Sequence, residues 1–375
     1  MRHAPPRKSL IWAHIGDLHI TGEQEPNYRD FLSVIDAIDT QLVSQIDFCV
    51  LPGDNANDGS PAQYELIRRG LDRLKVPVHV IPGDHDRKTD GLHAFYEGLR
   101  VAALPYAETL NGYRCLFLDL VSAGAGGPDF QLGDDQLRWL ESQLEDATRA
   151  GLSSIVFMHA YPSDLKPNGQ AVRDLFAKHA VAFVDMGHTH YNELANDGAT
   201  IFATTRSTGQ LEEGPVGFSL ACLHDGIVSW RFKPLHAEWP LVMITSPADY
   251  RLVTAISEPA RDAEDFLVTA RVLGSQAVRS CRFRIDSGLW TRLTFDVASN
   301  TWQGRCRAPV RQFKLSVEAV DAAGCSNVDT IVVAGPDTHF PRRRADGSDA
   351  DALGAWPERH LLGTRLGPNC NGRQW

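Results

Sequence analysis

The order of hydrophobic and polar residues divides the chain into regions of different character. In residues 1–238, short apolar runs alternate with segments whose apolar residues recur at helical spacing. Uninterrupted apolar runs are typical of strands buried on both faces, and single apolar stripes are typical of amphipathic helices. Strands are therefore expected at 9–15, 48–51, 78–81, 115–120, 154–158 and 181–186, and helices at 28–45, 61–75 and 133–147. This alternation predicts a layered α/β domain, with further strands at 200–205, 217–224 and 227–233.

The pattern changes from residue 239 onward. Residues 239–335 contain alternating segments and turn residues with little helical periodicity. Runs at 279–286, 291–297 and 312–324 have the alternation of half-buried antiparallel strands, so a small β-sandwich of immunoglobulin-like type is expected here. This domain is a candidate surface for homo-oligomer formation. The tail, 336–375, is rich in Gly, Pro and Arg but regains apolar character around Trp356 and Leu361, so we expect it to pack back on the protein.

Composition narrows the classes of function. The formal net charge of -10 argues against a protein whose main task is to hold a nucleic-acid backbone. No apolar run approaches the roughly 20 residues of a membrane-spanning helix, and the basic N-terminus lacks a cleavage signal, so neither a membrane partner nor export is predicted. The seven cysteines are scattered without a CxxC pair. They are typical of reduced thiols, and a cytoplasmic location is expected.

Candidate chemistry lies where five of the predicted strands end. The polar breaks read IGDLH (15–19), LPGDNAND (51–58), IPGDHDRK (81–88), FMHAYP (157–162) and MGHTH (186–190). In α/β sheets, ligands bind outside the carboxyl ends of the strands, so these side chains are expected to converge. The converging set is Asp17, His19, Asp54, Asp84, His85, His159, His188 and His190. Three carboxylates crowded together raise one another's pKa, and divalent cations would remove that conflict.

The donor types favour particular metals. Carboxylate oxygens combined with imidazole nitrogens suit zinc, manganese or iron better than calcium. The set is too large for one ion with an open position, whereas two ions sharing a carboxylate fit it, an arrangement typical of phosphoester hydrolysis. Any one of these histidines alone would more often be structural, as expected for His79, His93 and His179. The prediction of a two-metal site depends on all five breaks together.

These blocks resemble those of the calcineurin-like metallophosphoesterase family. The family order of Asp-x-His, Gly-Asp, Gly-Asn-His-Asp/Glu, His and Gly-His-x-His is matched over residues 9–235. The matching residues are Asp17-Leu18-His19, Gly53-Asp54, Gly83-Asp84-His85-Asp86, His159 and Gly187-His188-Thr189-His190. The resemblance implies a mixed β-sandwich flanked by helices. It says nothing about residues 240–375, where the small β-sandwich is expected from the alternation pattern alone.

The resemblance also implies roles for the residues. Asp17, His19 and His190 would hold one metal, Asp84, His159 and His188 the other, and Asp54 would bridge the two. His85 would lie beside the substrate, to stabilise the phosphorus centre or protonate the leaving oxygen. The implied reaction is attack of a metal-bridging hydroxide on a small-molecule phosphodiester. A phosphomonoesterase or nucleotide pyrophosphatase is the alternative; a nuclease is less favoured by the acidic balance, and a metal-free scaffold by the complete ligand set.

Asp84 departs from the family pattern, which usually has Asn there. Asp17, Asp54 and Asp84 contribute -3 against +4 from two divalent ions, which leaves +1 where Asn would leave +2. One hypothesis is that this favours a monoanionic diester over a dianionic monoester; the alternative is a tolerated isostere.

Three further residues are weaker candidates. Asp86 is grouped with His85 as a catalytic candidate and is expected to orient His85 or cap a helix. Asn57 and Arg206 are candidate substrate contacts. Turn chemistry is the alternative for Asn57, and a surface salt bridge is the alternative for Arg206.

Overall fold

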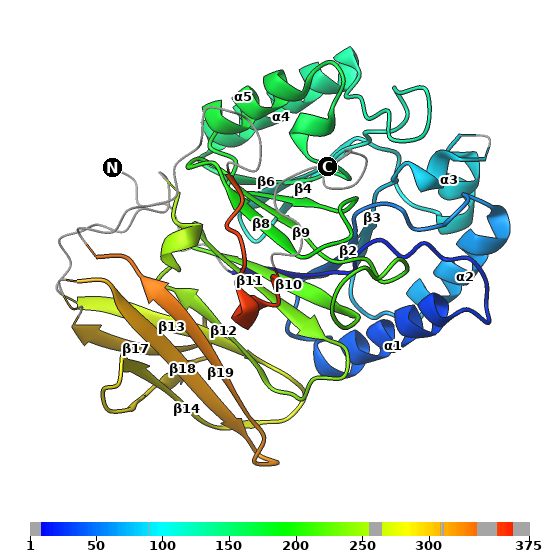
Figure 1. Cartoon of the computed structure of the whole chain (residues 1–375). Coiled ribbons are helices and arrows are strands. Elements are labelled where there is room, and N and C mark those ends of the chain that lie inside the picture. The colour runs from blue at the N-terminus through cyan, green and yellow to red at the C-terminus, as the bar shows by residue number, and fades with distance from the viewer. Residues whose placement is uncertain are drawn as a thin grey trace.

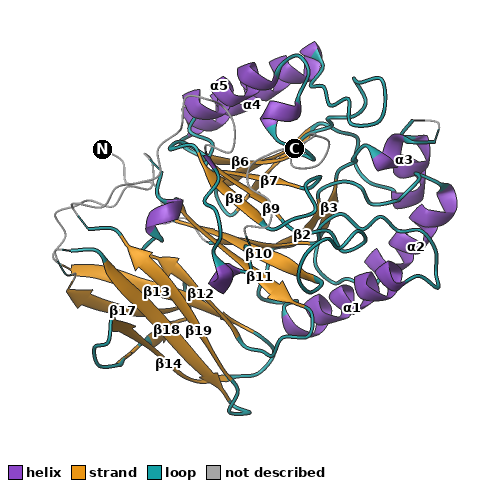
Figure 2. Cartoon of the chain, in the orientation of Figure 1, coloured by secondary structure: helices purple, strands orange, loops and turns teal. Residues whose placement is uncertain are grey.

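The computed structural model describes residues 9–89, 91–254, 265–307, 309, 311–335 and 351–362. Two mixed sheets face each other in the first part of the chain (Figures 1 and 2). The five-stranded sheet has the order β11-β10-β1-β2-β3, in which β1, β2 and β3 are parallel. Its strands are β1 (Leu10–His14), β2 (Phe48–Leu51), β3 (Val78–Val80), β10 (Gly217–His224) and β11 (Ile227–Pro234).

The second sheet has six strands in the order β4-β5-β6-β7-β9-β8. Within it, β5, β6, β7 and β9 run parallel, while β4 and β8 pair antiparallel with their neighbours. The strands are β4 (Tyr106–Leu110), β5 (Tyr113–Phe117), β6 (Ser153–Phe157), β7 (Phe183–Met186), β8 (Glu193–Asn196) and β9 (Ile201–Thr204). The mixed sandwich implied by the sequence is confirmed.

Aromatic side chains fill the space between the two sheets. Trp12 of β1 stacks on Phe48 of β2 and meets Phe157 and Phe183 of the opposite sheet edge to face. Asp185 of β7 also accepts hydrogen bonds from the Trp12 indole at 2.6 Å and from His14 at 2.5 Å. These buried contacts connect β1 to β7, and each of these strands leads into a predicted metal-binding loop.

Helices cover the outer faces of both sheets (Figure 1). On one side, α1 buries Phe31, Val34, Ile35 and Ile38, which belong to the predicted stripe. The helices on that side are α1 (Pro26–Gln41), α2 (Pro61–Leu71) and α3 (His93–Leu99), and those on the other are α4 (Asp134–Ala150) and α5 (Gly169–Lys178). Short 3-10 turns occur at η1 (His85–Arg87), η2 (Pro162–Asp164), η3 (Tyr250–Leu252) and η5 (Pro357–Arg359).

The later region forms two four-stranded antiparallel sheets, with the orders β12-β13-β17-β16 and β15-β14-β18-β19. Their facing side chains, among them Val268, Phe283, Leu315 and Val317, form a separate apolar core. The strands are β12 (Leu241–Ser246), β13 (Asp265–Leu273), β14 (Val278–Ile285), β15 (Thr291–Arg292), β16 (Thr294–Asp296), β17 (Thr301–Arg307), β18 (Phe313–Asp321) and β19 (Ser326–Val333). The C-terminal antiparallel β domain is thus present.

The described part of the tail, 351–362, lies against both domains. Trp356 and Leu361 are buried in the core between the five-stranded and six-stranded sheets. The Arg359 guanidinium donates to Asp329 of β19, and the backbone amide of Leu353 donates to Leu194 of β8. This segment therefore connects the β domain to the six-stranded sheet.

Two global features complete the description. Within the part of the chain that the structure describes, no helix has the length and apolar character needed to cross a membrane. Six cysteines are described and all six are free thiols, including Cys281, Cys306 and Cys325 of the β domain. Cys370 lies outside the described residues.

Candidate metal centre

The predicted ligands form two adjacent groups at the carboxyl ends of strands from both sheets. Loops after β1, β2 and β3 supply Asp17, His19, Asp54 and Asp84, and loops after β6 and β7 supply the remaining histidines. Within each group, one donor atom per residue lies within 4.8 Å of the others. The first group is Asp17, His19, Asp54 and His190, and the second is Asp54, Asp84, His159 and His188.

Asp54 is the residue common to both groups, and its two oxygens face different histidines. Its Oδ2 lies 3.6 Å from His19 Nε2, and its Oδ1 lies 3.5 Å from His159 Nε2. In the first group, His190 Nε2 is 3.6 Å from Asp17 Oδ2 and 3.0 Å from His19 Nε2. The Asp54 carboxylate therefore lies between the imidazole nitrogens of the two groups, as a bridging ligand requires.

The second group closes around Asp84. Asp84 Oδ1 is 3.5 Å from His159 Nε2 and 3.7 Å from His188 Nδ1. These separations are long for direct hydrogen bonds and suit donors arranged around a cation. Among the described residues, Asp84 Oδ1, His159 Nε2 and Asp17 Oδ1 are buried without a hydrogen-bond partner. Buried polar atoms are normally paired, so three inward-facing exceptions show that this donor set fits metal ions.

The backbone at these residues is unusual. His19, Asp54, His188 and His190 all have positive φ values, between 42° and 69°. Non-glycine residues rarely adopt this left-handed region, and such strain persists where the surrounding structure enforces it. Close packing also explains the glycine at position 53, because a Cβ built on Gly53 would lie 2.1 Å from the His159 ring. The loops are therefore shaped to bring ligand side chains close together at a cost in local stability.

Burial and mutual charge set the protonation of the group. Burial raises the pKa of Asp17. Burial lowers the pKa of His19 to about 3 and that of His188 to about 4. Burial alone would raise the pKa of Asp54, but His159, His19 and His85 hold it well below its usual value. His19 and His188 are thus held neutral beside the ionised Asp54, as metal ligation needs. Burial alone would lower the pKa of His159, but Asp54, Asp84 and Asp17 raise it well above its ordinary value.

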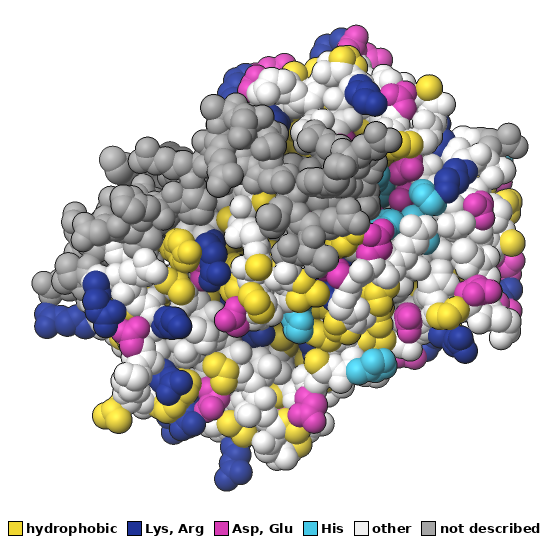
Figure 3. Space-filling model, viewed as in Figure 1, with side chains coloured by type: hydrophobic (Ala, Val, Ile, Leu, Met, Phe, Trp, Pro, Cys, Tyr) yellow, Lys and Arg dark blue, Asp and Glu magenta, His cyan; other side chains and the backbone are white. Residues whose placement is uncertain are grey.

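His85 lies beside the first group rather than within it. Its backbone N–H donates to Asp54 Oδ1 at 2.9 Å, and its ring packs edge-on against His19. Its Nδ1 lies 2.9 Å from the Asn57 carbonyl oxygen and 2.7 Å from the Lys88 ammonium. The same ammonium lies 3.2 Å from His85 Nε2, so Lys88 is beside both ring nitrogens. Histidine and acidic side chains also gather at one place on the molecular face in Figure 3.

Asp86, predicted as a catalytic candidate that orients His85, has among the described residues no hydrogen bond to the His85 ring or to a ligand side chain. Its carboxylate is fully buried and accepts from the backbone N–H groups of Gly83, Asn55 and Ala56, and from the Tyr64 hydroxyl. Burial and the neighbouring Asp54 raise its pKa to about 6. Asp86 therefore holds the two loops that carry Asp54 and Asp84 in register.

Asn55 is a supporting residue that the sequence analysis missed. Its side-chain amide donates to Asp86 and to the Ile81 carbonyl, at 2.9 Å each. The available signal was an Asn directly after Gly53-Asp54, a position that resembles ordinary turn chemistry. Asn57 contributes through its backbone oxygen, while its side chain donates to Asp58.

Arg206 is buried away from the ligand groups, so the prediction of a phosphate contact is corrected. It has 0% exposed surface, and its guanidinium donates to the carbonyl oxygens of Glu213, Pro215 and His360. It also pairs with the Glu213 carboxylate and packs over the Phe232 ring. Burial lowers its pKa. Arg206 thus attaches the tail to the loop after β9.

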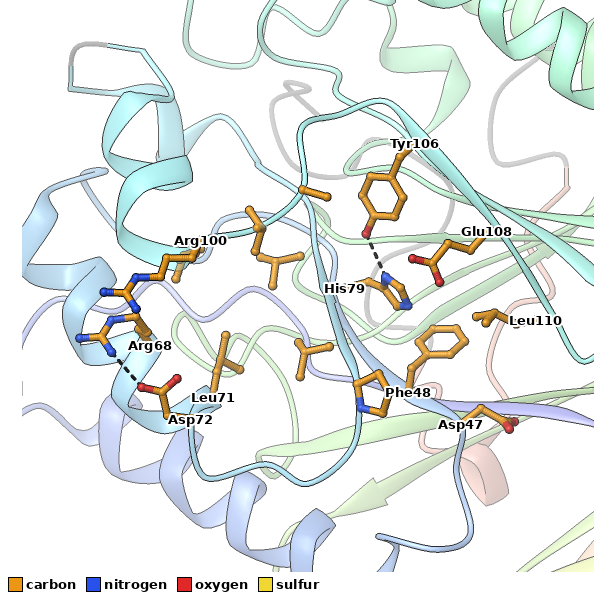
Figure 4. A pocket seen from close by; sticks show the side chains of 16 residues that line it. Asp47, Phe48, Arg68, Leu71, Asp72, His79, Arg100, Tyr106, Glu108 and Leu110 are labelled. Atoms are coloured by element: carbon orange, nitrogen blue, oxygen red, sulfur yellow. Dashed lines mark hydrogen bonds and ion pairs between the residues drawn. The ribbon is translucent and has the colours of Figure 1, made fainter.

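The histidines set aside as structural lie elsewhere. His79 of β3 lines a separate cavity of 500 Å³, where it meets the Tyr106 hydroxyl at 2.9 Å and stacks on Phe117 (Figure 4). Figure 4 shows Arg68 and Arg100 at the other end of this cavity. His93 is exposed on α3, and His179 follows α5 beside Thr148.

Known proteins resemble this chain in sequence. The sequence model of the calcineurin-like phosphoesterase family matches residues 12–192 of this chain. A glycerophosphodiester phosphodiesterase from Enterobacter lignolyticus is 34% identical over 184 residues, which cover 45% of this chain and 62% of that protein, less than two thirds of its length. The 3',5'-cyclic adenosine monophosphate phosphodiesterase of Escherichia coli K12 is 27% identical over 224 residues, covering 57% of this chain and 78% of that protein. A Synechococcus protein described as a "probable cyclic nucleotide phosphodiesterase" is 30% identical over 242 residues, covering 60% and 91%.

The layered fold and the two ligand groups define a metal-dependent phosphoesterase. The chain belongs to the calcineurin-like phosphoesterase family.

Proposed function

We propose that the protein hydrolyses a small-molecule phosphodiester, with two divalent ions held by the two ligand groups. The observation that carries this proposal is Asp54, whose oxygens face one histidine of each group at 3.6 and 3.5 Å. The relatives named as cyclic-nucleotide and glycerophosphodiester phosphodiesterases support the substrate class. The mixed oxygen and nitrogen donors favour manganese, iron or zinc.

The chain's own residues would divide the work. Asp17, His19 and His190 would hold one ion, Asp84, His159 and His188 the other, with Asp54 shared. When bound, such ions supply a nucleophilic water of lowered pKa and positive charge for the phosphoryl oxygens. His85, whose ring lies between the Asn57 carbonyl and Lys88, would be placed beside the leaving oxygen and, in its protonated form, would give it a proton. Asp86 keeps both carboxylate-bearing loops in place.

The test is a hydrolysis assay with a nitrophenyl phosphodiester beside the nitrophenyl phosphomonoester. The protein is first stripped with a chelator and then supplied with manganese, zinc or iron. We expect no hydrolysis after stripping, and preferential hydrolysis of the diester once metal returns. Activity that survives complete metal removal would contradict the mechanism. Preference for the monoester would favour the phosphomonoesterase alternative. The cytoplasmic location and homo-oligomer formation remain predictions.

Substrate charge preference is proposed to depend on Asp84. An Asp84→Asn variant would raise the net charge of the loaded site by one, from +1 to +2. We expect the diester-to-monoester ratio of kcat/KM to fall by about tenfold, which corresponds to ~1.4 kcal/mol. Asp135→Asn, which removes a 99% exposed carboxylate on α4, is the matched control. An unchanged ratio in Asp84→Asn would identify Asp84 as a tolerated isostere.

A further inference from the structure

The loop that follows β9 packs over the first ligand group. The Ser207 hydroxyl donates to the Asp17 carbonyl at 2.7 Å, and the Ser207 backbone N–H donates to the His190 carbonyl at 3.2 Å. Gly209 approaches so closely that a Cβ built on it would lie 2.0 Å from the Leu18 carbonyl oxygen. The loop is thus fixed directly to the chain segments that carry Asp17, His19 and His190.

Two side chains of this loop reach the outer nitrogens of the two histidines in the first group. The Gln210 side-chain amide lies 3.3 Å from His19 Nδ1, and Glu212 Oε1 lies 3.5 Å from His190 Nδ1. The Tyr191 hydroxyl donates to the other oxygen of Glu212. Both histidines direct Nε2 inward, where these nitrogens are 3.0 Å apart.

This geometry has a chemical consequence for metal ligation. An imidazole that offers Nε2 to a cation carries its hydrogen on Nδ1, so Nδ1–H needs an acceptor on the outside. A carboxylate in that place fixes the ring orientation and makes the inner nitrogen more basic. Glu212 is the carboxylate placed to meet this requirement for His190. In the described part of the chain, His190 Nδ1 has no hydrogen-bond partner at the 3.5 Å separation and would gain one through a small approach of Oε1. The Gln210 amide oxygen can accept from His19 once the amide is turned.

The second ligand group is supported differently. His159 Nδ1–H donates to the Pro52 backbone carbonyl at 2.8 Å, a neutral acceptor that belongs to the β2 loop itself. By contrast, the Glu212 side chain is 40% exposed and carries a charge. His190 of the first group therefore faces a charged side chain, whereas His159 of the second is oriented by buried backbone.

We propose that Glu212 is a positioning residue that sets the affinity of the first metal site without affecting the second, with Gln210 in a lesser role. This inference depends on the proposed function, because it assumes that both ligand groups bind ions. Loss of such an outer carboxylate typically weakens metal affinity by about 10- to 100-fold.

The test is a titration of the chelator-stripped full-length protein with Mn²⁺. Binding is measured by calorimetry and by the electron paramagnetic resonance signal of the bound ion. Glu212→Gln is expected to weaken one of two binding events by about tenfold or more and to leave the other unchanged. Gln210→Ala should weaken the same event to a smaller extent. Glu97→Gln, which removes a 70% exposed carboxylate on α3, should change neither.

Two backgrounds assign the affected site. In a His188→Ala protein, which retains the first group, Glu212→Gln should weaken the remaining site. In a His19→Ala protein, which retains the second group, it should have no effect. Equal effects in both backgrounds, or unchanged affinities in the otherwise native protein, would overturn the inference. Absence of Mn²⁺ binding by the native protein would instead contradict the proposed function. Equal melting temperatures of Glu212→Gln and native protein in chelator would separate altered binding from misfolding.

Discussion

Replacement of Asp54 by Asn is expected to reduce phosphodiester hydrolysis by at least about 10³-fold. Among the described residues, Asp54 is the one shared by both ligand groups, so the change removes a charged ligand from both. Metal ions in such sites stabilise the charge of the transition state by several kcal/mol, and each ~1.4 kcal/mol corresponds to a factor of ten in rate. The measurements are kcat/KM on the nitrophenyl diester and the metal content of the purified protein.

Asn suits this replacement because it has the same shape as Asp and tolerates the φ of 50° found there. A large loss of fold is therefore not expected, and circular dichroism can check this. Asp135→Asn serves as the control for a simple change of charge. Native activity and two bound metals in Asp54→Asn would show that Asp54 does not bridge the groups.

Replacement of His85 by Gln is expected to slow hydrolysis by about 10²-fold or more while leaving metal content unchanged. General acid catalysis contributes roughly 10²–10⁴-fold, and His85 lies outside both ligand groups. The loss should be greatest for a diester with an alkyl leaving group, which departs poorly without a proton. It should be smaller for a nitrophenyl diester, whose leaving oxygen is stable as an anion.

Comparison of the two substrates separates proton donation from charge stabilisation. An equal loss on both would mean that His85 acts on the phosphorus centre rather than on the leaving oxygen. His93→Gln, at an exposed position on α3, is the matched control and should retain native rates. Full activity of His85→Gln on the alkyl diester would exclude a catalytic role for this side chain.

The order of polar breaks along the chain carried most of the information about the site. Each break follows a buried strand, and parallel strands bring their carboxyl ends to one edge, so convergence of Asp17, Asp54 and His188 followed from sequence alone. The direction in which a long side chain points could not be predicted from the sequence. Arg206 is close in sequence to the site, yet it turns into the protein because Glu213 and the His360 carbonyl lie there.

Other features depended on contacts between distant segments. Gln210 and Glu212 stand in a loop without a metal motif, and only its packing against His19 and His190 reveals their position. The short elements α3, α5, β4 and β8 were not predicted. Segments such as β4, with five residues at a sheet edge, contain too few buried positions for their periodicity to stand out.

The tail segment has a consequence for how this architecture can be divided. Trp356 and Leu361 fill space inside the catalytic half, and Arg359 is bound to Asp329 of the β domain. A fragment that ends at residue 238 would lack these buried aromatic and aliphatic side chains, and Arg206 would lose the His360 carbonyl as a hydrogen-bond acceptor. A chimaera that exchanges only one of the two domains would lose these contacts unless the new sequence supplied others. The two domains are therefore expected to be inherited together.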